Sequence, residues 1–267
     1  MRRYGSRVTK ARIDAVLAER GLFPSRSAAA GAVRAGEVRV GRDGPVALRP
    51  SQLVEPDADL LVHAGPRFVS RGGVKLDNAL SALAIDVAGR DCLDVGASTG
   101  GFTDCLLQRG ANRVAAADVA YGQIAVRLRE DPRVVVIERL NARELEPAGL
   151  PFPPSLATID VSFISLRKVL PAVARCLVPG GEMLAMVKPQ FELGRERVRK
   201  GVVRDAGDRR EAILTVARCV EELGLPVRGF ASSGLPGPKG NRESFVWCGG
   251  EGESIANLEA AIGEVEP

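Results

Sequence analysis

A glycine-rich turn over residues 96–101 contains the first residues whose types and spacing could do chemistry. The residues before it suit a buried strand ending at Asp94, and Thr103 opens a segment with helical spacing. A strand, a glycine loop and a helix N-terminus form a cradle for a nucleotide-like ligand, because glycines allow close backbone approach and exposed N–H groups bind polar atoms. The residues expected in this cradle are Asp94, Gly96, Ala97, Ser98, Thr99, Gly100, Gly101 and Phe102.

The spacing inside the loop narrows the choice of ligand. A triphosphate-binding loop needs Lys after its last glycine, and this chain has Phe102 there. The dinucleotide fingerprint needs glycine at its third position, and this chain has Ser98, so NAD and FAD are disfavoured. Asp94 beside the loop favours a ligand with a cationic amine, such as S-adenosylmethionine. The alternative is an ordinary Gly-Gly turn.

Two further polar residues follow neighbouring apolar runs. Asp118 ends the next expected strand about 20 residues past the loop, where a carboxylate in doubly wound folds accepts hydrogen bonds from a ribose diol. Asn141 follows the apolar run 134–137 and could contact an adenine ring. A helix cap at Asp118 and a turn residue at Asn141 are the alternatives.

Four charged residues are expected at one edge of the sheet. Asp160 and Lys188 end two strands, and Lys75 lies on the helix that precedes the ligand strand. Glu243 opens the last strand, which must run antiparallel to bring it to the same edge. A ribose 2′-hydroxyl is a poor acid, so its methylation needs a base and stabilisation of the developing alkoxide.

Lys188 is the expected base. The neighbouring Lys75 favours a neutral amine there, while the two carboxylates oppose it and could orient the lysines and the hydroxyl. Any one of these residues alone is as readily a solvated strand-end charge. The four in this order favour a catalytic site.

The K-D-K-E order resembles that of the FtsJ-like ribose 2′-O-methyltransferases, and longer strings resemble the TlyA family within that group. These strings are Val69-Ser-Arg-Gly-Gly-Val-Lys-Leu76, Gly96-Ala-Ser-Thr-Gly-Gly-Phe-Thr103, Asp118-Val-Ala-Tyr-Gly-Gln123, Asp160-Val-Ser-Phe-Ile-Ser-Leu166, Val187-Lys-Pro-Gln-Phe-Glu192 and Gly234-Leu-Pro-Gly-Pro-Lys-Gly-Asn241. The resemblance implies methyl transfer from S-adenosylmethionine to the 2′-hydroxyl of cytidine in large-subunit ribosomal RNA, and in some members in small-subunit RNA. It also implies catalytic roles for Lys75, Asp160, Lys188 and Glu243. One departure is Phe68, where the family pattern has Trp or Tyr.

Strands alternating with helices predict the fold class. The expected strands are 91–94, 113–118, 134–137, 156–160, 183–188, 227–231 and 244–248, with helices at 75–83 and 208–223. This alternation indicates a Rossmann-like class I methyltransferase domain with a mostly parallel seven-stranded sheet. A last helix is expected over 255–262, followed by a frayed end. The expected divisions are a small α+β RNA-binding domain at 1–63, a linker at 64–73 and the methyltransferase domain at 74–267.

The first of these domains carries the excess charge. Residues 1–66 hold eleven Arg and Lys against seven acids, so the whole net charge of +4 lies there, which is typical of a phosphate-backbone binder. A helix from Ile13 to Gly21, a second one capped by Ser25 or Ser27, and strands at 38–40 and 59–63 resemble the alpha-L RNA-binding domain. An ordinary solvated surface is the alternative. The residues expected to contact RNA are Arg12, Arg20, Arg26, Arg34, Arg71, Arg195 and Arg197, the last two in a loop (194–201) expected to close on RNA.

Composition limits the remaining choices. No stretch approaches the 18 or so apolar residues of a membrane span. Five scattered cysteines without a Cys-x-x-Cys pair and a single histidine argue against a zinc site or a disulfide framework, and fit a reducing cytoplasm. We expect a monomer without a metal. The alternatives are a haemolysin-type membrane-active protein, a pseudouridine synthase, for which the glycine loop would have no purpose, and a non-catalytic RNA-binding protein.

Overall fold

The computed structural model describes residues 10–35, 37–41, 44–47, 49–62, 67–237 and 239–266. The chain divides into two compact units, Met1–Arg67 and Phe68–Pro267. The expected linker reached residue 73, but α3 (Arg71–Ala82) begins earlier, capped by the hydroxyl of Ser70, which accepts from the Gly72 amide. Residues 71–73 are therefore helical and not linker.

The first unit is a small α+β module. Its elements are β1 (Ala11–Arg12), α1 (Ile13–Glu19), α2 (Arg26–Ala35), β2 (Val38–Val40), β3 (Leu53–Val54) and β4 (Leu60–Val62). β1 pairs with β3 and β2 with β4, both antiparallel. The hydroxyl of Ser25 accepts from the Ala28 amide, so Ser25 caps α2. Ile13 and Leu17 on α1 are fully buried and share a core with Val33 of α2.

The second unit is built on a seven-stranded sheet, as expected. Its strands are β5 (Asp91–Val95), β6 (Arg113–Ala117), β7 (Val134–Ile137), β8 (Leu156–Ile159), β9 (Glu182–Val187), β10 (Val227–Ser232) and β11 (Ser244–Gly249). Their order is β10-β11-β9-β8-β5-β6-β7. β5 to β9 are mutually parallel, whereas β11 runs antiparallel to β9 and β10. The expected antiparallel last strand is therefore confirmed.

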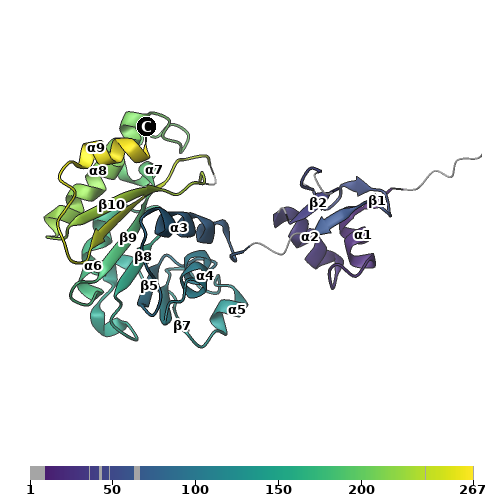
Figure 1. The fold of residues 1–267 in the computed structure, drawn as a ribbon, viewed down its shortest axis with the longest axis horizontal. Helices are drawn as coiled ribbons and strands as arrows, with labels where there is room; N and C mark the ends of the chain where they lie inside the picture. The colour runs from purple at the N-terminus through teal and green to yellow at the C-terminus, as the bar shows by residue number, and fades with distance from the viewer. Residues whose placement is uncertain are drawn as a thin grey trace, which may run out of the picture. The chain divides into compact units, whose positions relative to one another are not determined.

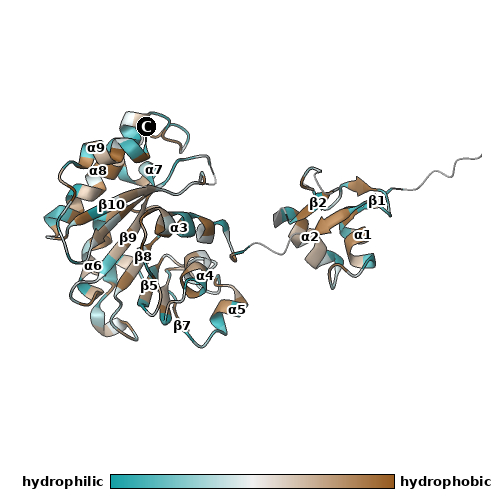
Figure 2. Cartoon of the chain, in the orientation of Figure 1, coloured by the Kyte–Doolittle hydropathy of each residue, from teal (hydrophilic) through white to brown (hydrophobic). Residues whose placement is uncertain are grey.

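Helices cover both faces of this sheet (Figure 1). They are α3, α4 (Gly101–Gln108), α5 (Val126–Arg129), α6 (Leu170–Cys176), α7 (Pro189–Glu192), α8 (Ala206–Glu222) and α9 (Leu258–Val265), with short 3-10 turns η1 (Ala142–Glu144), η2 (Pro147–Gly149), η3 (Leu166–Lys168) and η4 (Arg195–Arg197). Leu93 and Val95 of β5 pack on the side of α6 and α8, and Cys92 on the side of α3 and α4. The central strands are accordingly apolar along their length (Figure 2).

The end of the chain is ordered more tightly than its sequence indicates. Glu266 was expected in a frayed tail, yet it is 3% exposed. Its carboxylate accepts from Arg209 of α8 at 2.7 Å and lies 3.4 Å from Arg242. The prediction was wrong because these two arginines, which are distant in the sequence, bind the Glu266 carboxylate and fix its position.

Candidate functional site

The glycine loop between β5 and α4 lies directly against the end of β8. Gly96 has φ +85°, and a Cβ atom there would lie 2.4 Å from the carbonyl oxygen of Asp160, so this position requires glycine. Gly96, Ala97, Ser98, Thr99, Gly101 and Phe102 line a cavity of about 920 Å³. Gly100 faces the other way, against Leu128. The loop therefore presents backbone to an open space, as the sequence indicates.

Asp94 lies beneath the loop. It is fully buried, and one carboxylate oxygen accepts from the hydroxyl of Thr103 at 2.7 Å. Burial raises the pKa of Asp94 to about 7, against the opposing effect of the Thr103 hydrogen bond. The side chain expected to face a cationic amine thus ties the end of β5 to α4, and it is not among the residues that line the two cavities described here.

Asp118 lies where the sequence places it, immediately after β6. Its two carboxylate oxygens accept from the amides of Ser98 and Ala120, both at 2.7 Å. It lines a second cavity of about 510 Å³ at the carboxyl ends of β5, β6 and β8. A carboxylate has lone pairs for further donors, so Asp118 can still accept from hydroxyl groups.

Asn141 lines the same smaller cavity. Its side-chain oxygen accepts from the Arg143 amide at 3.2 Å and so caps η1. Asn141 is thus a turn residue, which was one of the two alternatives that the sequence left open, and it also lies beside the cavity.

The two cavities adjoin. Both are lined by Gly96, Ser98, Asp160, Ser162 and Phe163. A ligand whose nucleoside part occupied the smaller cavity could therefore extend past Asp160 into the larger one. Mostly apolar walls with two carboxylates, Asp118 and Asp160, fit an adenosine group. Most of such a ligand is buried against apolar side chains, and a few polar groups fix its orientation.

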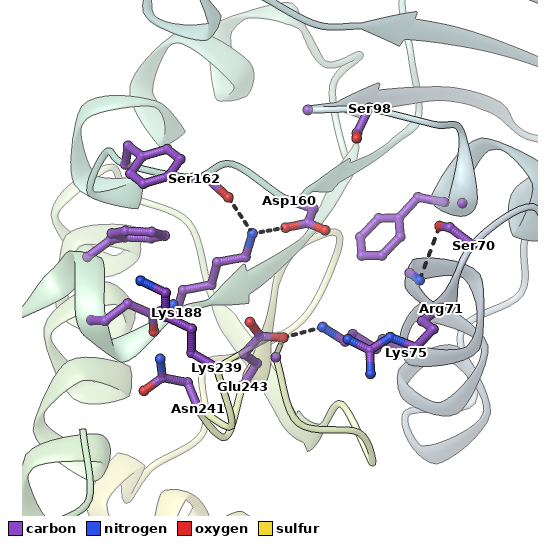
Figure 3. Close-up of a pocket in the computed structure, with 18 of the residues that line it drawn as sticks. Ser70, Arg71, Lys75, Ser98, Asp160, Ser162, Lys188, Lys239, Asn241 and Glu243 are labelled. Atoms are coloured by element: carbon purple, nitrogen blue, oxygen red, sulfur yellow. Dashed lines mark hydrogen bonds and ion pairs between the residues drawn. The ribbon is translucent and has the colours of Figure 1, made fainter. Parts of the chain in front are cut away.

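The four expected catalytic residues come together in the larger cavity as two ion pairs (Figure 3). Lys75 from α3 pairs with Glu243, and both side chains are buried. Lys188, immediately after β9, pairs with Asp160. The Nζ atom of Lys188 also donates to the hydroxyl of Ser162 at 2.9 Å.

This arrangement follows from the sheet. Asp160 and Lys188 leave neighbouring parallel strands at the same edge, and the antiparallel β11 brings its preceding residue, Glu243, back to that edge. The Ser244–Val187 register sets Glu243 beside Lys188 along the two backbones. The site therefore holds two lysines, each in contact with one carboxylate, at one edge of the sheet.

Sequence reasoning missed several residues of this cavity. Ser162 follows Asp160 by two positions, so its proximity to a strand end was a usable signal. Phe163 is 91% exposed at φ +64° and its ring lies 5.2 Å from that of Phe191. Asn241 accepts from the Val203 amide and donates to the Gly201 carbonyl, which no local pattern indicates.

The expected RNA-contacting arginines of the first unit differ in their surroundings. Arg12 pairs with Asp14 through two nitrogens, at 3.0 and 2.7 Å, and Arg26 lies 3.5 Å from the same carboxylate. Arg20 donates to the backbone carbonyls of residues 56 and 58. Arg34 is exposed in the last turn of α2. Three of these four arginines are thus engaged within the unit.

The three remaining arginines lie in the second unit. Arg71 is exposed at the start of α3 and lines the larger cavity. Arg197 pairs with Glu211 at 2.5 Å and lies 3.5 Å from Asp208, both on α8. The side chain of Arg195 lies outside the described part of the chain. The expected RNA-closing loop is therefore tied to α8 at Arg197.

Within the described ranges, no group of three or more His, Cys, Asp or Glu side chains could hold a metal ion. No helix in that part of the chain is long and apolar enough to cross a membrane.

Residues 68–250 match the model of the FtsJ-like methyltransferases, and residues 11–60 match that of the S4 domain. The chain belongs to the FtsJ-like methyltransferase family. Its first unit is an S4 domain, which confirms the expected small RNA-binding module by its fold.

Two curated relatives place the chain within the TlyA family. The 16S/23S rRNA (cytidine-2′-O)-methyltransferase TlyA of Mycobacterium tuberculosis is 50% identical over 241 residues, which cover 89% of each chain. The protein named "Putative rRNA methyltransferase YqxC" of Bacillus subtilis is 43% identical and covers 96% of this chain and 92% of its own. The resemblance that the sequence strings indicated is confirmed.

A solved structure agrees with the fold of this TlyA-family chain. A protein named "Putative hemolysin from Streptococcus thermophilus" is 37% identical, with a TM-score of 0.73 and 96% of each chain covered. Its name belongs to the membrane-active alternative, whereas its sequence and fold match both units of this FtsJ-like chain.

Proposed function

We propose that this protein transfers a methyl group from S-adenosylmethionine to the ribose 2′-hydroxyl of cytidine in ribosomal RNA. The observation that carries the proposal is the pair of lysine–carboxylate ion pairs, Lys75–Glu243 and Lys188–Asp160, in one cavity beside the glycine loop. The name of the M. tuberculosis relative supports cytidine in ribosomal RNA as the substrate, and the S4 domain supports an RNA partner. A substrate of this kind implies a cytoplasmic protein.

The smaller cavity is the proposed site of the nucleoside part of the cofactor. Asp118 would accept from the ribose hydroxyls, Asn141 would lie beside the adenine, and the loop 96–102 would bind the remainder through backbone groups. Bound S-adenosylmethionine would supply a methyl group on a sulfonium centre, an electrophile that needs no further activation. The larger cavity then receives the ribose.

Lys188 is the proposed proton acceptor. In its neutral form, the Lys188 amine would donate its two hydrogens to Asp160 and Ser162 and would take the proton of the 2′-hydroxyl on its lone pair. The contacts with Asp160 and Ser162 fix the orientation of that amine. The cofactor would supply the methyl group and leave as a neutral thioether. Lys75, held by Glu243, stabilises the negative charge that develops on the oxygen.

The test is methyl transfer to ribosomal subunits followed by mapping of 2′-O-methylcytidine. Lys188→Ala should lower turnover by about 10²–10⁴, the usual loss for a positioned acid–base group, while fold and cofactor affinity stay unchanged. Lys188→Arg should also fail, because a guanidinium cannot shed a proton near neutral pH. Lys168→Ala, an exposed lysine on η3, is the matched control.

Three results would contradict this proposal in different ways. A Lys188→Arg variant that kept most of its activity would show that only positive charge is needed, and the base role would be withdrawn. A wild-type protein that binds S-adenosylmethionine but methylates no ribosomal RNA would refute the substrate assignment. Lysis of cells by the purified protein without cofactor would favour the membrane-active alternative.

A further inference from the structure

The larger cavity carries an excess of positive charge that the catalytic residues do not account for. Its two acids are each paired with one of the proposed catalytic lysines, Glu243 with Lys75 and Asp160 with Lys188. Two more cations line the same cavity, Arg71 and Lys239. Within the described residues neither has an ion pair, and both are exposed. The excess charge of the cavity therefore resides on Arg71 and Lys239.

Arg71 is positioned by the start of α3. It is the first residue of that helix, directly after the capping Ser70. Lys75 follows four residues later, and residues four apart lie on the same helix face, one turn from each other. Arg71 thus extends the catalytic face of α3 toward the solvent, at the mouth of the cavity.

Lys239 approaches the site from a different element. It lies in a turn closed by the Gly237 amide on the Asn241 carbonyl, at 2.8 Å, four residues before Glu243. Its Nζ atom packs over Gly201, where an added Cβ atom would lie 3.4 Å away. Figure 3 shows Lys239 beside Glu243 and Lys188, and Arg71 on the helix that carries Lys75. Arg71 and Lys239 therefore flank the ion pairs from two directions.

We propose that Arg71 and Lys239 hold the two backbone phosphates that flank the target ribose. This inference rests on the proposed function and deepens it, because it names the part of the RNA that the catalytic cavity itself recognises. The two residues are positioning residues: they bind non-reacting groups and so set the 2′-hydroxyl against Lys188.

The chemistry of the substrate requires groups of this kind. In an RNA chain the 2′-hydroxyl is bordered by one phosphate on the neighbouring 3′-oxygen and another on the 5′-oxygen of the same sugar. Phosphate contacts fix register and orientation on a nucleic acid. A guanidinium can take a phosphate through two parallel hydrogen bonds and an ammonium can take one as a point charge.

A small probe separates phosphate recognition from all other RNA contacts. With the full-length protein loaded with S-adenosylhomocysteine, the affinities for cytidine and for cytidine 3′,5′-bisphosphate are compared by titration. The wild-type protein should prefer the bisphosphate. A hydrogen bond to a charged group contributes about 1.5–3 kcal/mol, so Arg71→Ala and Lys239→Ala should each weaken bisphosphate binding roughly tenfold or more.

Matched measurements make the assignment specific. Cytidine binding should change little in both variants, and Lys168→Ala should bind both probes as the wild type does. The 5′- and 3′-monophosphates of cytidine should assign one phosphate to each residue, since each variant should lose affinity for only one of them. Lys239→Arg should retain the preference for the bisphosphate.

Three results would overturn the proposal. The first is equal or undetectable binding of both probes by the wild-type protein. The second is an unchanged preference in both alanine variants. The third is a loss of S-adenosylmethionine affinity in Arg71→Ala or Lys239→Ala, which would assign the cation to the cofactor's carboxylate instead. Methyl transfer to ribosomal subunits is measured separately and tests the proposed function. Failure of the proposed function can therefore be told apart from failure of phosphate binding by Arg71 and Lys239.

Discussion

At the scale of single residues, the same side-chain type has opposite roles in different surroundings. Asp118 lines a cavity and accepts from two backbone amides, whereas Asp94 is fully buried beneath the loop and accepts from the hydroxyl and the backbone amide of Thr103. Asp14 is held by two arginines, and the Arg12 hydrogen bond lowers its pKa. Burial, in contrast, raises the pKa of Asp94 to about 7. The carboxylates therefore respond to pH in different windows.

The buried Asp94 should make stability fall as pH rises from about 4 to about 7. Its pKa is higher in the folded chain than the ordinary unfolded value of about 3.9, so the folded state binds more protons in this window and its stability is lost as that proton leaves. Asp94→Asn keeps an acceptor for Thr103 and cannot ionise. Thermal unfolding between pH 5 and 8 should therefore show a weaker decline for this variant than for the wild type.

A remaining decline is expected in that variant, because burial also raises the pKa of Glu192. Acids with lowered pKa, such as Asp14, lose their contribution only as pH falls below about 4, outside this range. An identical pH profile for Asp94→Asn and wild type would show that Asp94 carries no raised pKa.

At the scale of elements, the ends of the parallel strands were predictable from the sequence and the partners of their side chains were not. Asp118, Asp160 and Lys188 each follow an apolar run, so their meeting at one edge follows from the parallel sheet alone. The pairing of Lys75 with Glu243, 168 residues apart, depends on how α3 packs against the antiparallel end of the sheet, where it contacts β10. No local pattern indicates such a pair.

Two very short strands could not be predicted from the sequence either. β1 and β3 have two residues each, too few for an alternating pattern to be visible.

Asn241 joins its own turn to the segment 201–203 through hydrogen bonds of 2.8 and 2.9 Å, a contact made across about 40 residues of chain. Side-chain hydrogen bonds between residues far apart in the chain, such as these, could not be predicted from the sequence.

The segment 194–201 should contribute to RNA turnover through Arg199 and Lys200. Both are exposed and, within the described residues, neither has an ion pair, whereas Arg197 is held by Glu211 on α8. Arg199→Ala with Lys200→Ala should lower methyl transfer to ribosomal subunits severalfold, without a change in cofactor affinity. Each lost phosphate contact should also reduce the salt slope of RNA binding by about 0.7 to 0.9.

Arg197→Ala is the matched control for that segment. Its guanidinium is already neutralised locally, so its removal should alter the salt slope less than the double substitution. A larger effect for Arg197→Ala would assign RNA contact to that side chain and make its pairing with α8 a resting arrangement.

At the scale of the whole molecule, the net charge and the proposed cofactor site lie in different units. The first 66 residues carry the entire net charge of +4, and the residues that line the two described cavities belong to the second unit. Each unit has a hydrophobic core of its own. RNA affinity and cofactor affinity should therefore be separable by truncation.

The position of the cut should decide which property is lost. Removal of residues 1–67 leaves Phe68, the bond from the Val69 amide to Asp104 at 2.8 Å, and the Ser70 cap in place. This truncation should lose most RNA affinity and keep S-adenosylmethionine affinity nearly unchanged, as measured by calorimetry. RNA binding that survived with an unchanged salt slope would refute the role of the S4 unit.

Removal of residues 1–70 should instead damage the proposed cofactor site. Phe68 is 1% exposed and packs against Gly73, and Gly73 in turn lies against the carbonyl of Gly101 in the cofactor loop. Loss of a buried phenylalanine side chain costs about 3–5 kcal/mol of stability in well-packed cores. The longer truncation should therefore unfold at lower temperature and bind S-adenosylmethionine more weakly than the shorter one. Equal cofactor affinity in the two truncations would show that the loop is held by α4 and β5 alone.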